Sequence, residues 1–205
     1  MLATDLAPRV LADRISMRGW TASSAATTAG YAGAPDLSVV IPMRNARDTV
    51  GTLLRDLLAV PGVDLEVIVV DDASSDDSAE RVDQVAGDAV QVIRLDQRHG
   101  AGHARNVGFA HASGRYTLFF DADDEIHPQA LRSAMAMLED TRADVAFLPY
   151  RYRRGHSEYE GMNDYDRSVW AQYAPRQGEA LTLDEVPRLL GFSNYPWNKI
   201  VRTDR

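Results

Sequence analysis

Residues 37–59 read LSVVIPMRNARDTVGTLLRDLLA, an apolar run followed by a segment with helical periodicity. The run 37–41 is nearly continuous and β-branched, which is typical of a strand covered on both faces of a sheet. Within 48–59 the apolar residues recur at the spacing of one helix face, at Val50, Leu53, Leu54, Leu57 and Leu58. The stretch therefore predicts a buried strand followed by an amphipathic helix.

The same alternation of strand and helix continues to about residue 150. Further short apolar runs occupy residues 65–70, 90–95, 116–120 and 144–148. Segments of helical period separate them, at residues 78–86, 102–112 and 128–140. Strands joined through single helices form parallel sheets with right-handed crossovers. We therefore predict an α/β fold, an open and mostly parallel sheet flanked by helices, that begins near residue 36.

The two ends of the chain lack this alternation. Residues 21–35 are small, polar and aperiodic, so we interpret residues 1–35 as an N-terminal extension that ends in a flexible linker. Apolar residues between Leu2 and Met17 would allow a short helix at a membrane surface. From residue 151 to about residue 180 the sequence is irregular, and residues 182–191 predict a last helix.

Composition excludes several classes of function. The 205 residues carry a net charge of −8 and no run of basic residues, so we expect no nucleic-acid partner. The absence of cysteine excludes a disulfide framework, a thiolate metal site and a cysteine nucleophile, and it fits a reducing compartment. The sequence contains no apolar run of about 18 residues that could span a membrane. A soluble cytoplasmic protein is the simplest interpretation.

Acidic residues gather where the predicted strands end. Asp71 and Asp72 follow the second strand, Asp96 follows the third, and Asp121 and Asp123 follow the fourth. The carboxyl ends of parallel strands share one edge of a sheet, and ligands bind there. Neighbouring carboxylates repel each other unless a cation compensates them, and Mg²⁺ or Mn²⁺ takes carboxylate and phosphate oxygens. The pattern predicts a divalent cation and a phosphate-bearing substrate at this edge.

A glycine-rich turn, GAGHARN at residues 100–106, precedes one of the predicted helices. Gly100 and Gly102 would let the backbone approach a ligand closely, and the N–H groups at the start of the helix would face an anion. Arg105 could then face the phosphates. The alternative is a tight strand-to-helix turn with a solvated Arg105, and the turn alone does not decide between them.

Three motifs in this order resemble the family 2 glycosyltransferases of the GT-A fold. They are VVIPMRNARDTV at 39–50, VIVVDDASSDDSAE at 67–80 and GAGHARNVGFAHASGRYTLFFDADDEI at 100–126, and the resemblance covers residues 37–150. Members of this family are inverting enzymes with a Rossmann-like sheet that use nucleotide-diphosphate sugars. The resemblance implies transfer from a UDP-sugar, or another nucleotide-diphosphate sugar, to a glycan or lipid-linked acceptor in cell-surface polysaccharide synthesis.

The resemblance also implies a role for each matching residue. Five residues would surround the nucleotide, with Asp71 bonding the base, usually uracil; they are Pro42, Asn45, Asp71, Asp72 and Ser74. Gly102 and Arg105 would lie near the diphosphate. Asp121 would lie near the ribose or the donor sugar, and Asp123, together with Asp121, would bind Mn²⁺ or Mg²⁺. Residues 36–150 are then the nucleotide-sugar-binding core, and residues 151–205 begin the acceptor-side region.

The catalytic base is the part of the family pattern that we do not find. In the family it is usually the Asp of a Glu-Asp pair beyond a tryptophan and lysine segment, which YPWNKIVR at 195–202 resembles. The chain ends at Arg205 before such a pair, so we expect the base beyond Arg205 and the region 151–205 to be truncated. Asp184 and Glu185 precede Trp197 and resemble the first turn of a helix. Trp197 could belong either to the core or to a sugar subsite.

Three other readings compete with this one. Haloacid-dehalogenase-like phosphatases also have an Asp-x-Asp after an apolar strand, but on the first strand and with Thr or Val where Glu125 stands here. Receiver domains have an acidic pair after the first strand, whereas Asp71 follows the second. A non-catalytic module that binds nucleotide sugars would explain the missing base. For the enzyme we expect a cytoplasmic location, with peripheral association at the inner face of the membrane as a further expectation.

Overall fold

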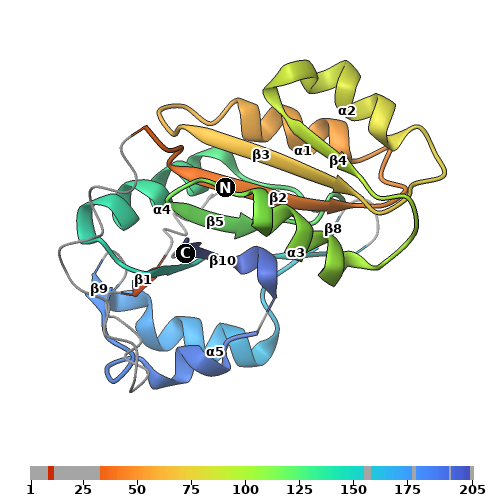
Figure 1. Cartoon of the computed structure of the whole chain (residues 1–205). Coiled ribbons are helices and arrows are strands. Elements are labelled where there is room, and N and C mark those ends of the chain that lie inside the picture. Colours follow the sequence, from red (N-terminus) through yellow and green to blue (C-terminus); the bar gives the residue numbers. More distant parts are fainter. Residues whose placement is uncertain (1–8, 12–32, 155–157, 177–178, 194, 204–205) are drawn as a thin grey trace. The chain divides into compact units, whose positions relative to one another are not determined.

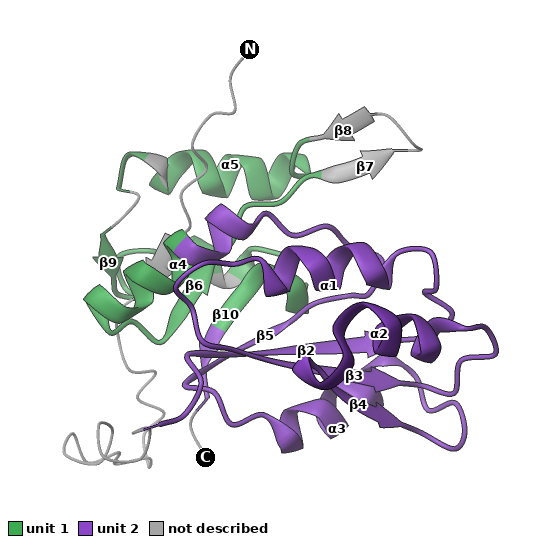
Figure 2. Cartoon of the chain, turned by 90° about the horizontal axis from the view of Figure 1, so that it is seen from above, with its two compact units in different colours: residues 1–15, 133–200 green, residues 16–132, 201–205 purple. Residues whose placement is uncertain are grey.

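The computed structural model describes residues 9–11, 33–154, 158–176, 179–193 and 195–203 (Figure 1). The chain divides into two compact units (Figure 2). The larger unit comprises residues 16–132 and 201–205, and the smaller unit comprises residues 1–15 and 133–200. In the described part of the chain, no helix is long and apolar enough to cross a membrane.

The larger unit contains the predicted parallel sheet. Its strands lie in the order β4 (Gln91–Arg94), β3 (Leu65–Asp71), β2 (Leu37–Met43) and β5 (Tyr116–Phe119), and all neighbouring pairs are parallel. In the register, Met43 lies beside Asp71. The carboxyl ends of these strands therefore meet at one edge, as the sequence predicts.

Helices cover both faces of this sheet. The connections contain α1 (Val50–Leu58), α2 (Ser78–Ala86) with η1 (Gly87–Ala89), and α3 (Ala101–His111), while α4 (Pro128–Thr141) follows β5. Helices α1 and α3 lie on opposite faces (Figure 2). All seven residues of β2 are buried, which explains the continuous apolar run in the sequence. The boundaries of the strands and helices to residue 141 agree with the prediction to within about two residues.

Helix α3 packs unusually close to the sheet because Gly108 has no side chain. A Cβ atom at Gly108 would lie 2.4 Å from Cγ1 of Val40 and 3.1 Å from Cγ2 of Val70. Ala104 and Ala112, which are also small and buried, continue this contact. The small residues set the position of α3, and with it the position of its N-terminus at the carboxyl edge of the sheet.

At the opposite edge, Glu66 ties three segments together. Its carboxylate accepts hydrogen bonds from the backbone N–H of Ser113 at 2.8 Å, from the Ser113 hydroxyl at 2.8 Å, and from the Ser38 hydroxyl. Ser38 in turn accepts the N–H of Gly114 at 2.8 Å. Burial acts to raise the pKa of Glu66, but these hydrogen bonds outweigh it and lower the pKa below its usual value.

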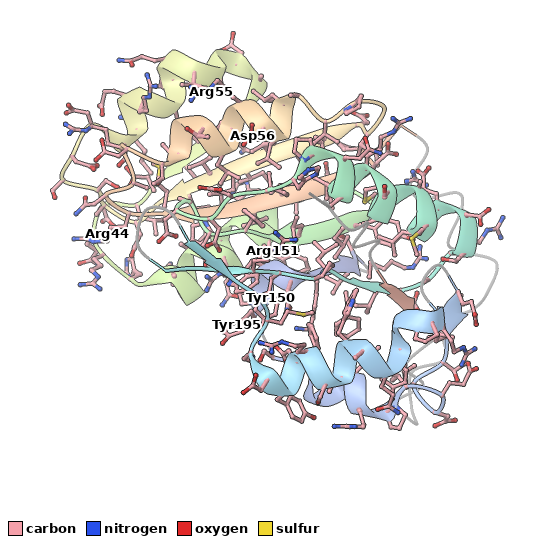
Figure 3. All side chains as sticks on the ribbon, turned by 180° about the vertical axis from the view of Figure 1, so that it is seen from behind. Arg44, Arg55, Asp56, Tyr150, Arg151 and Tyr195 are labelled. Carbon is pink, nitrogen blue, oxygen red and sulfur yellow. The ribbon has the colours of Figure 1, made fainter. Side chains whose placement is uncertain are left out.

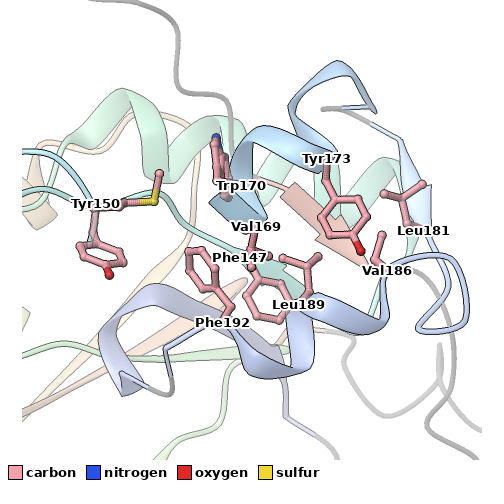
Figure 4. Close-up of a cluster of buried hydrophobic side chains, with 10 residues drawn as sticks. Phe147, Tyr150, Val169, Trp170, Tyr173, Leu181, Val186, Leu189 and Phe192 are labelled. Carbon is pink, nitrogen blue, oxygen red and sulfur yellow. The ribbon is translucent and has the colours of Figure 1, made fainter. Parts of the chain in front are cut away.

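The smaller unit has a mixed set of short elements. Strand β1 (Arg9–Leu11) pairs antiparallel with β6 (Val145–Phe147) and parallel with β9 (Ala180–Leu181). The other elements are the hairpin of β7 (Tyr152–Arg154) and β8 (Glu158–Glu160), α5 (Asp164–Tyr173), η2 (Ala174–Arg176), η3 (Pro187–Gly191), η4 (Pro196–Asn198) and β10 (Lys199–Arg202), of which Val201 and Arg202 belong to the larger unit. Its core gathers aromatic and aliphatic side chains around Phe147, Trp170 and Phe192 (Figure 4).

Three expectations for the ends of the chain differ from the structure. Val10 and Leu11 lie in strand β1, so they do not continue a helix; residues 1–8 and 12–32, with most of the expected linker, lie outside the described residues. The segment 151–180 is not simply irregular, because it contains α5. The predicted helix 182–191 is wrong: residues 183–185 form a turn and only η3 is helical, since Pro187 lacks the N–H that an α-helix needs at that position.

Candidate functional site

The loops after β2 and β3 hold each other in place at the carboxyl edge. The N–H of Asn45 donates to Oγ of Ser74 at 2.9 Å, and the N–H of Ser75 donates to Oδ1 of Asn45 at 2.8 Å. Nη1 of Arg44 donates to the carbonyl oxygens of Asp72 at 2.8 Å and Ala73 at 2.9 Å (Figure 3). The predicted residues Asn45 and Ser74 therefore lie together, and their side chains shape the loops.

Both loops contain a strained residue at the point where they meet. Asn45 has φ of +50° and Ala73 has φ of +53°, a left-handed conformation that costs a residue with a Cβ free energy. Asn tolerates it better than most residues because its short polar side chain bonds locally. Ala73 has no such compensation of its own, and the two bonds from Arg44 to the neighbouring carbonyl groups hold it there.

Asp72 connects β3 to the start of α3. Its side chain is 3% exposed; Oδ1 accepts the N–H of His99 at 2.6 Å and Oδ2 accepts the N–H of Gly100 at 2.8 Å. Burial alone would raise the pKa of Asp72, but these two bonds and the nearby charge of Arg44 lower it below its usual value. The carboxylate therefore remains ionised at neutral pH and fixes the glycine-rich turn against the end of β3.

Asp71 is the last residue of β3 and is also buried. Its Oδ1 accepts the N–H of Ser74 at 3.0 Å, which closes the turn after the strand. Pro42, on the neighbouring strand β2, is buried as well. The predicted nucleotide residues thus form one continuous edge, in which side chains support the loop backbone.

A pocket opens at this edge between the loops after β2, β3 and β4. Its lining residues are Pro42, Met43, Arg44, Asp72, Arg98, Gly100 and Ala101. Asp72, and not Asp71, contributes its carboxylate to this lining. Arg44 and Arg98 were not among the predicted site residues, although both directly follow predicted strands in an otherwise acidic edge. With both oxygens of Asp72 already accepting backbone N–H groups, the two arginines are the side chains there that can attract an anion.

Arg105 and Asp121 form an ion pair across the edge, from Nη2 to Oδ1. The side chains are 22% and 29% exposed respectively. Nε of Arg105 is buried and has no hydrogen-bond partner among the described residues. Such an unsatisfied donor is costly unless a ligand or water completes it. The guanidinium group is therefore held at the edge by its pair with Asp121, and its buried Nε is left unsatisfied among the described residues.

Three carboxylates crowd the turn after β5. Burial, followed by the charges of Asp123 and Asp121, raises the pKa of Asp124 to about 6. This repulsion is what a bound cation would relieve. Among the described residues, no group of three His, Asp or Glu side chains is placed to hold a metal ion, and the predicted donor set is the pair Asp121 and Asp123. Mg²⁺ and Mn²⁺ fit that donor set, because substrate phosphates and water complete their shells.

Gly102 lies in the first turn of α3, and no atom would lie within 4 Å of a Cβ atom added to it. Packing therefore does not require glycine at this position. Gly100, by contrast, has φ of +93° and precedes the helix as its N-cap. The open surface beside Gly102 leaves room for a ligand at the N-terminus of α3.

In the smaller unit, Asp184 and Glu185 lie in a turn, not in the first turn of a helix. Glu185 accepts the N–H of Thr182 at 2.9 Å and pairs with Arg176 at 3.0 Å. These bonds lower the pKa of Glu185, which disfavours its acting as a proton acceptor. The pair is thus accounted for by the local turn.

Trp197 packs against the aromatic core of the smaller unit. Its ring stacks on Tyr195 with centroids 4.8 Å apart and an interplanar angle of 6°, and Tyr150 meets both rings edge-on. Nζ of Lys199 donates a hydrogen bond to the carbonyl oxygen of Ser193 at 2.8 Å. Packing accounts for Trp197, while its use in a sugar subsite stays a prediction.

Comparisons with known proteins agree with this arrangement. The family model described as Glycosyl transferase family 2 matches residues 38–193. The succinoglycan biosynthesis protein ExoO of Rhizobium meliloti is 36% identical over 133 residues, which cover 62% of this chain and 38% of ExoO. The poly(ribitol-phosphate) β-N-acetylglucosaminyltransferase TarS of Staphylococcus aureus is 30% identical over 129 residues, which cover 61% of this chain and 22% of TarS. The chain thus covers well under half of either relative.

Comparison with solved structures tests the predicted fold. The crystal structure of S. aureus TarS 1–349 in complex with UDP superimposes with a TM-score of 0.64 at 27% identity. The match covers 82% of this chain and 47% of that one. A further crystal structure of the same TarS region contains UDP-GlcNAc, again with a TM-score of 0.64 and 27% identity. The open α/β sheet predicted from the sequence is confirmed as a GT-A fold.

Proposed function

Because the chain belongs to glycosyltransferase family 2, we propose that its larger unit binds a nucleotide-diphosphate sugar, with a UDP-sugar as the preferred donor. The sugar is transferred to a glycan or lipid-linked acceptor in polysaccharide synthesis. The observation that carries the proposal is the carboxyl edge itself. There a pocket with two arginines, an ion-paired Arg105 and a crowded acidic turn lie within one unit. The UDP and UDP-GlcNAc complexes of TarS support the choice of donor.

In this proposal the nucleotide occupies the pocket between the loops after β2, β3 and β4. Pro42 and Asp72 line its floor, while Asp71, Asn45 and Ser74 keep the loops in position. Since those side chains already bond backbone groups, the loop shape, more than free side-chain donors, would select the base. Asp71 also remains our candidate for the bond to the base.

The diphosphate would lie toward the N-terminus of α3, beside Gly102 and Arg105. The free N–H groups of the first helical turn favour an anion, and Gly102 leaves space for its approach. The guanidinium group of Arg105 supplies a positive charge, and its pairing with Asp121 keeps it oriented. These groups would stabilise the negative charge that the leaving diphosphate gains during transfer.

Asp121 and Asp123 would hold Mn²⁺ or Mg²⁺. Burial, followed by the charges of Asp123 and Asp121, raises the pKa of Asp124, and a cation at the turn after β5 would relieve the repulsion among these carboxylates. When bound, the ion would neutralise charge on the leaving diphosphate. Asp121 has a second task in this proposal, because its carboxylate also orients Arg105.

Inverting transfer also needs a base that removes the proton of the acceptor hydroxyl. Glu185 is bonded within its local turn, and Asp184 lies in the same turn, so we assign the base to neither and propose that it lies beyond Arg205. Peripheral association with the inner face of the membrane would bring a lipid-linked acceptor to the enzyme. The alternative is that the protein has no catalytic base, in which case it would act as a nucleotide-sugar-binding module without transferring the sugar.

Calorimetric titration of UDP tests the donor site. We expect binding that requires Mn²⁺ or Mg²⁺ and that is strongly weakened in Asp123→Ala, with Asp88→Ala as a matched control because Asp88 is exposed and lies on η1, away from the site. Binding of UDP that ignores the metal would contradict the assignment of Asp123. Absence of any nucleotide binding would contradict the donor site, and release of phosphate from simple esters would indicate a phosphatase instead.

A further inference from the structure

Two imidazole rings lie side by side at the beginning of α3. The ring centroids of His99 and His103 are 4.5 Å apart, with an interplanar angle of 35°. Both residues are exposed; His103 lies in the first turn of α3, and His99 directly precedes the N-cap Gly100. Neither ring fills a core, so the two imidazole groups are open to solvent and to a ligand.

The separation of the rings is that of two ligands of one metal ion. An imidazole nitrogen binds such an ion at about 2.1 Å, so two neighbouring ligands of an octahedral ion, at a right angle, place their ring centroids about 4.6 Å apart, whereas the tetrahedral angle of Zn²⁺ places them about 5.3 Å apart. The observed 4.5 Å is close to the octahedral value. Rotation of the two rings about their side-chain bonds would then turn one nitrogen of each toward the ion, without movement of the backbone.

The backbone that carries the two histidines is fixed. The N–H groups of His99 and Gly100 both donate to the buried carboxylate of Asp72, and the N–H of Ala104 donates to the carbonyl of Gly100 at 3.1 Å. Asp72 lies near enough to His99 for the two charges to interact, so its negative charge would also favour a cation there. The site needs little reorganisation to bind an ion, which improves affinity.

We propose that His99 and His103 form a two-imidazole site for a borderline divalent ion in octahedral coordination, such as Ni²⁺. Such ions bind imidazole nitrogen well, whereas Mg²⁺ prefers carboxylate oxygens such as those of Asp121 and Asp123. Water completes the remaining coordination positions. The chain between the two histidines includes Gly100 and Ala101, which line the nucleotide pocket, so an ion at this site stiffens one wall of that pocket.

Titration with NiCl₂, in excess Mg²⁺ to occupy the carboxylate site, tests the proposal without any nucleotide. We expect one Ni²⁺ per chain, and affinity at least about tenfold lower in His99→Ala or His103→Ala, because the second imidazole binds intramolecularly. His111→Ala is the matched control, since His111 is exposed at the other end of α3. Equal affinity in the wild type and His103→Ala, or an equal loss in His111→Ala, would overturn the proposal.

A spectroscopic measurement supplies an independent readout. Paramagnetic Ni²⁺ should broaden the imidazole NMR signals of His99 and His103 first, while those of His111 and His127 persist at the same metal concentration. Broadening of the last two signals first would refute the site. A failure of this titration leaves UDP binding unaffected, so it is distinguishable from a failure of the donor site.

Discussion

Replacement of Asp72 by Asn should destabilise the larger unit. The carboxylate is 3% exposed and accepts two backbone N–H groups, from His99 at 2.6 Å and Gly100 at 2.8 Å. The amide of Asn keeps one acceptor oxygen for one of these N–H groups, but its NH₂ group, itself a donor, then faces the other N–H group. Since hydrogen bonds to a charged group contribute about 1.5–3 kcal/mol each, we expect the free energy of unfolding to fall by about 2–4 kcal/mol.

Urea titration followed by circular dichroism measures this loss, with Asp88→Asn as an exposed control that should change stability by less than about 0.5 kcal/mol. The pKa of Asp72 is lowered from its usual 3.8, so its contribution is present above that pH and is lost as the pH falls through the lowered value. The difference between wild type and Asp72→Asn should therefore persist from pH 7 to about pH 4. A loss no larger than that of the control would refute the structural role of this carboxylate.

Four further replacements test packing and buried charge. Gly108→Ala places Cβ 2.4 Å from Val40, so urea titration should show about 1–3 kcal/mol lower stability. Gly102→Ala should not lose stability but should weaken UDP binding. A Gly102→Ala variant that is less stable than Gly108→Ala would contradict the packing of α3. Glu66→Gln should lower the free energy of unfolding at pH 7. The difference from the wild type should disappear once the pH has fallen through the pKa of Glu66, which lies below its usual 4.5. A loss of stability that does not depend on pH would contradict this. Asp166→Asn disturbs a fully buried carboxylate that accepts three hydrogen bonds. Near-UV dichroism should therefore show that the packing of the smaller unit loosens at a lower urea concentration, and an unchanged midpoint would contradict this.

Periodicity predicted the larger unit well because each of its segments has one dominant pattern. The run 37–41 and the helix 48–59 are typical, and their boundaries differ little from those of β2 and α1. In the smaller unit the signals conflict. Helix α5 has Val169, Trp170 and Tyr173 on its buried face, a helical spacing that its polar and aromatic surroundings obscured. At 182–191 the apolar spacing suggested a helix, but Pro187 prevented one.

The site was predictable as a set of positions but not as a set of contacts. The ends of parallel strands must meet, so Asp71 and Asp121 could be placed at one edge from the sequence alone. Which atoms those carboxylates bond depends on the conformation of the loops. The left-handed turn at Ala73, the two N–H groups on Asp72 and the bonds from Arg44 to loop carbonyls have no periodic signature, so the sequence did not reveal them.

The most direct test of the central claim is a crystal structure of this chain with UDP and Mn²⁺. We predict uridine density in the pocket lined by Pro42, Asp72 and Gly100, the diphosphate beside the N-terminus of α3, and an anomalous manganese peak at Asp121 and Asp123. Nucleotide or manganese bound elsewhere, with this edge empty, would contradict the account.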